Sequence, residues 1–169
     1  MRQNEDISRS VRSLCERYGT RDPFRIAEAM GIHILYSDAL HRLKGMYRVI
    51  KRNRFIILNA KNSEQMNRIV CAHELGHDQL HRVFATEHAL HEFALYDMST
   101  RVEYEANIFA AELLLETDTV LDMTRAGMDT VQIAAATETD INLVALKADS
   151  LIRAGYELRG QPHNSRFLK

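Results

Sequence analysis

The 169-residue sequence predicts an α+β fold, in which a small antiparallel three-stranded sheet packs against a helical core and further helices follow toward the C-terminus. Three observations predict it. Apolar residues recur at helical spacing before residue 31, three short β-branched or aromatic runs lie between residues 32 and 59, and helical spacing returns after residue 62. A chain of this length can bury a core without disulfide bonds.

The first thirty residues predict two helices. The first is amphipathic and ends at Gly19. Asp22 is suited to cap the second helix, Pro23 fits its first position, and Gly31 lies where a C-terminal cap belongs. The apolar positions that define the first helix are Ile7, Val11, Leu14, Cys15 and Tyr18.

The middle of the chain predicts the sheet. The runs IHILY, GMYRVI and FIILN are short and rich in residues that favour strands, and the polar KRNR separates the last two. We therefore expect three antiparallel strands. A helix then begins at Ser63 and contains NRIVCAHELGHDQLH, and an irregular connection with His88 and His91 leads to a second long helix, RVEYEANIFAAELLLE.

Three shorter helical segments complete the chain: TVLDMTRAG, VQIAAATE and INLVALKADSLIRAG. We expect a main domain over residues 1–116, a C-terminal helical subdomain packed on it over 117–155, and a tail over 156–169. The sequence contains neither an internal repeat nor a sharp change in composition.

Composition limits the possible functions. The formal net charge of -1 argues against nucleic-acid binding, which usually needs a basic surface. No apolar run approaches the roughly 20 residues that span a bilayer. The two cysteines cannot build a disulfide framework, and the sequence does not begin with an export signal. We expect a soluble, cytoplasmic protein without membrane association, and a monomer by default.

The stretch CAHELGHDQLH carries the clearest chemistry. His73 and His77 are four residues apart, so on a helix both imidazoles project from one face and can bind one ion. Glu74 lies beside the first histidine, where a carboxylate can act as general base on a water without binding the metal. Zinc suits such ligands best, and manganese or iron can occupy the same set.

The alternative is a polar helix that is rich in histidine by chance. Gly76 speaks against it, because a glycine costs about 1 kcal/mol in a helix and needs a packing or access reason. His81 lies eight residues from His73, too far to share its ion, and we interpret it as a packing or hydrogen-bonding residue. Cys71 points to another face and reads as a small buried hydrophobe.

A catalytic zinc site needs a third protein ligand. A third histidine at the spacing of metzincin sites is absent. Glu103 shares a helix face with Asn107, which could hydrogen-bond a ligand histidine, whereas Glu105 points elsewhere. A competing interpretation makes Glu103 part of a capping box with Thr100, and spacing alone does not separate the two. The candidates for the third ligand are His88, His91, Glu92, Glu103 and Glu105.

These motifs resemble the ImmA/IrrE family of metallopeptidases. The resemblance rests on AHELGH and EYEANIFAAELLL, and upstream on RDPFRIAEAMGIHILY, RLKGMY and FIILN, and it covers about residues 18–115. It implies a zincin-like helical core with a gluzincin-like site in which His73 and His77 bind zinc and Glu74 is the general base. The third ligand would be Glu103 or Glu105, and the helix-face argument favours Glu103.

The resemblance also implies a function. Family members make limited cuts in transcriptional repressors, often those of prophages or mobile elements, and so release gene expression. The expected substrate is therefore a helix-turn-helix repressor. The group that stabilises the oxyanion is open, with Tyr47, Tyr104, His88 and His91 as candidates by chemistry.

A different class of function is possible for TVQIAAATETDINLVALK, in which a short helix, a polar turn and a second helix follow one another as in a helix-turn-helix. Between residues 117 and 150, however, six acidic residues stand against only Arg125 and Lys147, and such a surface would repel phosphate. The alternative function is a non-catalytic, metal-stabilised module that binds a repressor or DNA through these C-terminal helices. Glu74 argues against it, because a binding site does not need a general base.

Overall fold

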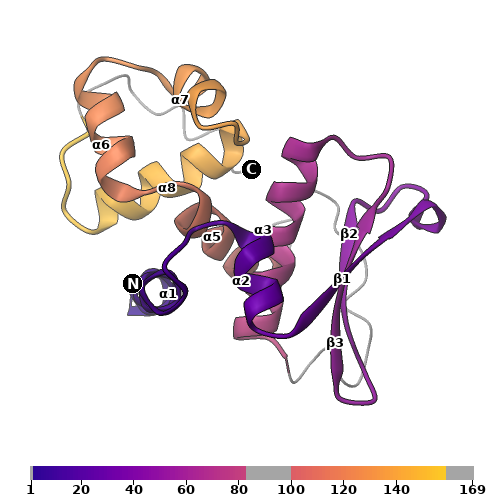
Figure 1. The fold of residues 1–169 in the computed structure, drawn as a ribbon. Coiled ribbons are helices and arrows are strands. Elements are labelled where there is room, and N and C mark those ends of the chain that lie inside the picture. The colour runs from indigo at the N-terminus through magenta and orange to yellow at the C-terminus, as the bar shows by residue number, and fades with distance from the viewer. Residues whose placement is uncertain (1, 83–99, 159–169) are drawn as a thin grey trace.

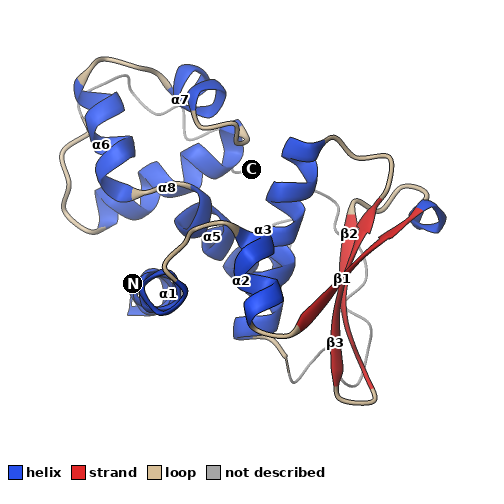
Figure 2. Ribbon diagram, viewed as in Figure 1, coloured by secondary structure: helices blue, strands red, loops and turns tan. Residues whose placement is uncertain are grey.

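The computed structural model describes residues 2–82 and 100–158 and has an α+β fold (Figures 1 and 2). Its N-terminal elements are α1 (Arg2–Tyr18), α2 (Pro23–Ala29), β1 (Ile32–Ser37), the 3-10 turn η1 (Asp38–Leu40), β2 (Gly45–Ile50), β3 (Asn53–Asn59) and α3 (Glu64–Leu80). Its later elements are α5 (Arg101–Leu114), α6 (Thr117–Arg125), α7 (Thr130–Ala136) and α8 (Ile141–Arg153). The expected helices and the three strands are confirmed.

The sheet is mixed, so the prediction of a purely antiparallel sheet was wrong. The strand order is β1-β3-β2, with β2 antiparallel and β1 parallel to β3. Lys51 and Arg52 both have positive φ and form the tight hairpin turn between β2 and β3. The chain after β1 passes through η1 before it turns back, which leaves β3 room to pair between the two other strands. At the centre of the sheet, Ile56 and Leu58 of β3 are fully buried.

Helix α3 lies between the sheet and α5 (Figure 1). It packs against β2 and β3 on one side and against α5 on the other. Gly76 lies at the contact between α3 and α5, where an added Cβ would be 3.1 Å from Cβ of Phe109 and 3.2 Å from Cα of Ala106. This close approach is the packing reason for Gly76 that the sequence required.

Local signals at the helix starts agree with the sequence. The side chain of Asp22 accepts a hydrogen bond from the backbone N–H of Phe24, and Pro23 is the first residue of α2. Ser63 caps α3 by accepting from the N–H of Met66. These caps fix where α2 and α3 begin.

The C-terminal helices lie on the far side of α5 from the sheet (Figure 1). Helix α8 packs on α5, and the buried apolar residues form one cluster from Ile7 on α1 to Leu151 on α8. None of the helices within residues 2–82 and 100–158 is long and apolar enough to cross a bilayer. The expected tail falls largely on residues 159–169, which lie outside the described residues.

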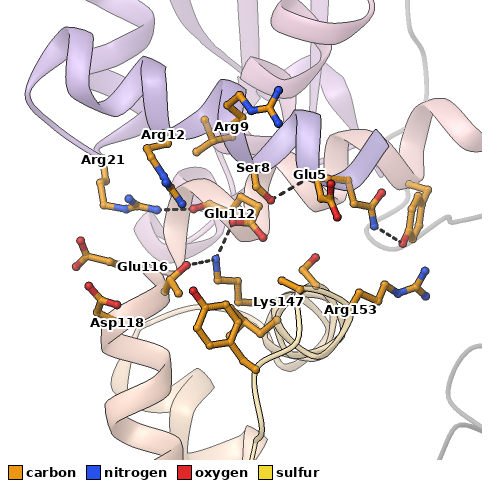
Figure 3. A pocket seen from close by; sticks show the side chains of 18 residues that line it. Glu5, Ser8, Arg9, Arg12, Arg21, Glu112, Glu116, Asp118, Lys147 and Arg153 are labelled. Atoms are coloured by element: carbon orange, nitrogen blue, oxygen red, sulfur yellow. Dashed lines mark hydrogen bonds and ion pairs between the residues drawn. The ribbon is translucent and has the colours of Figure 1, made fainter. Parts of the chain in front are cut away.

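A polar pocket of about 720 Å³ lies where α1, α5 and α8 meet (Figure 3). Within it, Nζ of Lys147 donates to Oε2 of Glu112 at 2.7 Å and to Oγ1 of Thr117 at 2.9 Å. Lys147 is 1% exposed and Glu112 is 7% exposed. The guanidinium of Arg21 donates to the backbone carbonyls of Glu112 and Leu113, so a cation caps the C-terminal end of α5.

Candidate metal centre

The HELGH segment lies in the part of α3 that is enclosed by both the sheet and α5. His73 is 1% exposed, Glu74 2% and His77 3%. Three polar side chains at such depth cost free energy unless each has a partner. Their burial is therefore the first structural sign that this segment has a purpose other than solvation.

Three side chains converge in a geometry that fits one metal ion. His73 Nε2 lies 3.0 Å from His77 Nε2 and 3.1 Å from Glu103 Oε2, and His77 Nε2 lies 3.5 Å from Glu103 Oε1. Ligand atoms about 2 Å from a tetrahedral zinc would be about 3.4 Å apart. Two imidazoles and one carboxylate are also the donor set that zinc accepts. Among the described residues, these three form a candidate metal site.

In a full capping box the Glu103 carboxylate would also accept from the backbone N–H of Thr100, and the structure has only the other half of that motif. Thr100 caps α5 by accepting a hydrogen bond from the backbone N–H of Glu103. The Glu103 carboxylate lies instead with the two histidines. The Glu103 carboxylate is therefore at the candidate metal site and not in a capping box, while Thr100 caps the helix through the backbone of Glu103. Glu105, the other glutamate considered, lies 3.0 Å from His81 Nε2 and is not part of the three-residue site.

Asn107 lies one turn after Glu103 on α5, and its Oδ1 is 3.0 Å from His73 Nδ1. With the proton on Nδ1, the other ring nitrogen of His73 is free to bind a metal. The amide nitrogen of Asn107 is buried without a hydrogen-bond partner in the structure. A buried amide nitrogen without a hydrogen-bond partner costs free energy. The hydrogen bond of Asn107 to His73 is therefore what explains an asparagine at this buried position.

Glu74 lies beside the three-residue site but is not one of its members. Burial raises the pKa of its carboxyl to about 7, although the nearby His77 and a hydrogen bond from the backbone of Tyr47 act in the opposite direction. A carboxyl with a pKa near neutrality can both accept and donate a proton, which is the property of a general acid-base group.

The metal-free electrostatics prepare two of the three side chains for a cation. Burial lowers the pKa of His73 to about 4, which keeps its imidazole neutral. Burial alone would raise the pKa of Glu103, but hydrogen bonds from both histidines outweigh it and bring the value to about 2. Burial would lower the pKa of His77, and the contact with Glu103 reverses this to a net rise. Metal binding requires a neutral imidazole and an ionised carboxylate.

The hydroxyl groups proposed for the oxyanion lie away from these three side chains. Tyr47 is fully buried, and its hydroxyl donates to Asp78 Oδ1 at 2.6 Å. Arg54 also binds Asp78, so this hydroxyl is held in a network of β2, β3 and α3. The Tyr104 hydroxyl accepts from Asn4 at 3.3 Å. The contribution of Tyr47 near Glu74 comes from its backbone.

His88, the remaining candidate for a substrate or supporting role, lies outside the described residues, as do His91 and Glu92. Two other predictions are confirmed. His81 makes hydrogen bonds, with its Nδ1 3.3 Å from His77 Nδ1, and Cys71 is a fully buried hydrophobe. Sequence reasoning missed the pairing of His81 with Glu105, because the two residues lie on different helices; the four-residue spacing of His77 and His81 indicates only the contact between those two histidines.

The comparisons with known proteins agree with this geometry. Residues 27–148, well over half of the chain, match the profile of the IrrE N-terminal-like domain of peptidase family M78. The uncharacterized immunity region protein 2 of Bacillus phage phi105 is 36% identical over 109 residues, which are 64% of this chain and 68% of that protein. Metallopeptidase ImmA of Bacillus subtilis strain 168 is 29% identical over 123 residues, 70% of this chain and 68% of that protein. The chain belongs to the ImmA/IrrE family of metallopeptidases.

Proposed function

We propose that this chain is a zinc-dependent endopeptidase of the cytoplasm that makes limited, site-specific cuts in a helix-turn-helix repressor and so derepresses genes. One observation carries the catalytic part of the proposal. A buried carboxylate, Glu74, lies next to three metal-binding side chains without being one of them, and its pKa is raised to about 7. A purely structural metal site has no use for such a group.

The residues have distinct tasks in this reaction. His73, His77 and Glu103 would hold zinc, which supplies a Lewis acid that lowers the pKa of water and polarises a carbonyl. Glu74 takes the proton of the attacking water and later gives it to the leaving amine. Asn107 holds the imidazole of His73 in the tautomer and orientation that its task needs.

The free edge of β2 offers a place for the substrate chain. Because the N–H of Asn59 donates to the carbonyl of Lys44, the alternation of an antiparallel pair directs the backbone of Gly45, Tyr47 and Val49 away from β3. In the described sheet β2 is an edge strand. An extended peptide that paired with this edge would lie beside Glu74, to which the backbone of Tyr47 is hydrogen-bonded.

The choice of a repressor as substrate rests on the family and on the name of one relative. That relative is a protein of a phage immunity region. The C-terminal helices offer little to DNA, because Lys147 is 1% exposed and bound to Glu112, and Arg125 is paired with Asp122 at 2.8 Å. We assign these helices to the core and to contact with a protein substrate.

The test combines metal content with cleavage. Purified parent protein should hold about one zinc per chain by elemental mass spectrometry, and His77→Ala should hold little. The parent should then cut a purified phage-type helix-turn-helix repressor into two fragments, with the bond located by mass spectrometry. Glu74→Gln should keep the zinc and lose about 10²- to 10⁴-fold in rate.

Two results would count against the proposal. A parent protein that binds no zinc, even after the metal is supplied, would remove the peptidase mechanism. A zinc-loaded parent that binds the repressor but leaves it intact would favour the non-catalytic binding module. Cleavage at equal rates by the parent and Glu74→Gln would point to a contaminating protease.

A further inference from the structure

The two histidines of the candidate site differ on the side that faces away from Glu103. His73 turns its Nδ1 to Asn107, whereas His77 turns its Nδ1 to a third histidine, His81, at 3.3 Å. We infer that His81 and Glu105 are positioning residues, which hold the imidazole of His77 in the orientation and tautomer needed for metal binding. The inference rests on the proposed metal site and adds to it.

The contacts form a continuous chain from the site toward the surface. His81 Nε2 lies 3.0 Å from Glu105 Oε2, and the other oxygen of Glu105 accepts from Nε of Arg101 at 2.6 Å. His81 is 4% exposed, while the side chain of Arg101 is 74% exposed. The chain therefore begins in the protein interior and ends at a solvated guanidinium.

The direction of each hydrogen bond follows from the chemistry of the groups. His77 can bind a metal through Nε2 only when this nitrogen carries no proton, so its proton is on Nδ1 and is donated to His81 Nδ1. The proton of His81 is then on Nε2 and is donated to Glu105. An ionised carboxylate only accepts, so it ends the chain. One arrangement of protons satisfies all three groups.

This arrangement orients His77 and strengthens it as a donor. A carboxylate that acts on a ligand histidine fixes the ring and raises its basicity, and here the effect of Glu105 is relayed through His81. The rings of His77 and His81 are 5.4 Å apart at 55°, so neither can rotate without breaking the contact between their Nδ1 atoms. Asn107 performs the same task for His73 directly.

A simpler interpretation is that His81 and Glu105 only tie α3 to α5. The two interpretations differ in the property that a substitution of His81 would change. A structural tie stabilises the fold with or without metal, so its removal lowers the melting temperature of the metal-free protein. A positioning contact changes the affinity for zinc in a protein whose metal-free stability is nearly unchanged.

The experiment measures the zinc affinity of the full chain by competition with a chelator, in the parent and three variants of His81. Asparagine places an oxygen where Nδ1 was and keeps an acceptor for His77, whereas glutamine reaches Glu105 but offers nothing at the Nδ1 position. We expect His81→Ala and His81→Gln to bind zinc about 10- to 100-fold more weakly than the parent. His81→Asn should bind zinc more tightly than His81→Gln but more weakly than the parent, because it keeps the acceptor for His77 and loses the contact with Glu105.

The matched control is His33→Ala, which removes an exposed histidine on β1 and should leave zinc affinity unchanged. Melting temperatures of all metal-free proteins are measured in parallel. If His81→Ala does not fold, the comparison of His81→Asn with His81→Gln still decides.

Equal zinc affinity in the parent, His81→Asn and His81→Gln would overturn the inference while leaving the metal site intact. So would a loss of metal-free stability that accounts for the whole change in affinity. A parent that binds no zinc would instead contradict the proposed function and, with it, the inference. Failure of the proposed function is therefore distinguishable from failure of the inference alone.

Discussion

Helix α5 carries a carboxylate near each end, Glu112 buried and Glu103 partly buried, and the two have opposite surroundings. Glu112, near the C-terminal end, is bound by the ammonium of Lys147 at 2.7 Å, so the protein supplies the cation from its own chain. Glu103, near the N-terminal end, faces two imidazole nitrogens at 3.1 and 3.5 Å. Burial keeps His73 neutral, whereas the contact with Glu103 raises the pKa of His77, so the cation beside Glu103 is a titratable imidazole rather than a permanent ammonium.

The difference separates a structural ion pair from a candidate site for a metal ion. A buried charge is stable only when paired and hydrogen-bonded. Glu112 and Lys147 meet that condition within the chain. The cluster of His73, His77 and Glu103 meets it fully when a metal enters. The comparison can be tested by removing charge at either end of the same helix.

The largest effect on stability is expected at the C-terminal end. Lys147→Met leaves Glu112 buried without its cation and should lower the free energy of unfolding by about 3–5 kcal/mol, measured by urea denaturation. The double variant Glu112→Leu/Lys147→Met removes both charges and should regain most of the loss. If the single and double variants are equally destabilised, the pair is not acting through its charge. Zinc affinity should not change in the double variant.

Neutralising the carboxylate at the other end should act on the metal instead. Glu103→Gln should weaken zinc binding by more than about 100-fold, above the range for residues that only support a ligand. Glu112→Gln is the matched control on the same helix and should bind zinc like the parent. Chelator competition measures both. Similar losses in the two variants would mean that the helix as a whole, rather than the ligand, had been disturbed.

The spacing between α3 and α5 can be tested at Gly76. Gly76→Ala would place its methyl group 3.1–3.2 Å from Phe109 and Ala106, and should cost about 1–3 kcal/mol of stability because two packed helices must move apart. His77 and Glu103 lie on opposite sides of this contact, so zinc affinity should fall as well. Gly127→Ala, at a site without close neighbours, would separate packing from backbone effects, since its cost comes from positive φ alone.

The smallest expected effect is a dependence of metal-free stability on pH. The pKa of Glu74 is raised from 4.5 to about 7, so the folded protein holds this proton more tightly than the unfolded chain does. The resulting stability is complete below pH 4.5 and is lost as the pH rises through 7. After the metal has been removed with a chelator, the stability of Glu74→Gln relative to that of the parent should therefore be higher at pH 8 than at pH 4.5. A difference that stays constant with pH would contradict the raised pKa.

Local chemistry made the helices, the hairpin and the spacing of His73 and His77 predictable from the sequence. Caps such as Asp22 and Ser63 act within three residues of their partners, so a reader of the sequence can find them. The position of β1 was not accessible in this way. Its parallel pairing depends on β3 entering between two earlier strands, which is a property of the whole sheet.

The outer parts of the site were hidden for a related reason. The partner of the Tyr47 hydroxyl is Asp78, 31 residues away, and the partner of His81 is Glu105, 24 residues away. No periodicity links such residues. Glu103 was ambiguous because the same spacing suits its carboxylate for a capping box with Thr100 and for a metal site, and only the packing of α3 on α5 brings it to His73 and His77.

The free edge of β2 also has a consequence for the protein in a crowded cell. An unpaired strand edge that can accept a peptide can equally accept another copy of itself, which is the usual start of sheet-mediated aggregation. This edge is only six residues long, Arg48 is exposed on it, and Lys51 and Arg52 form the turn at its end. Short length and positive charge oppose long-range stacking of copies along this edge, without closing it to the single extended segment that we propose as substrate.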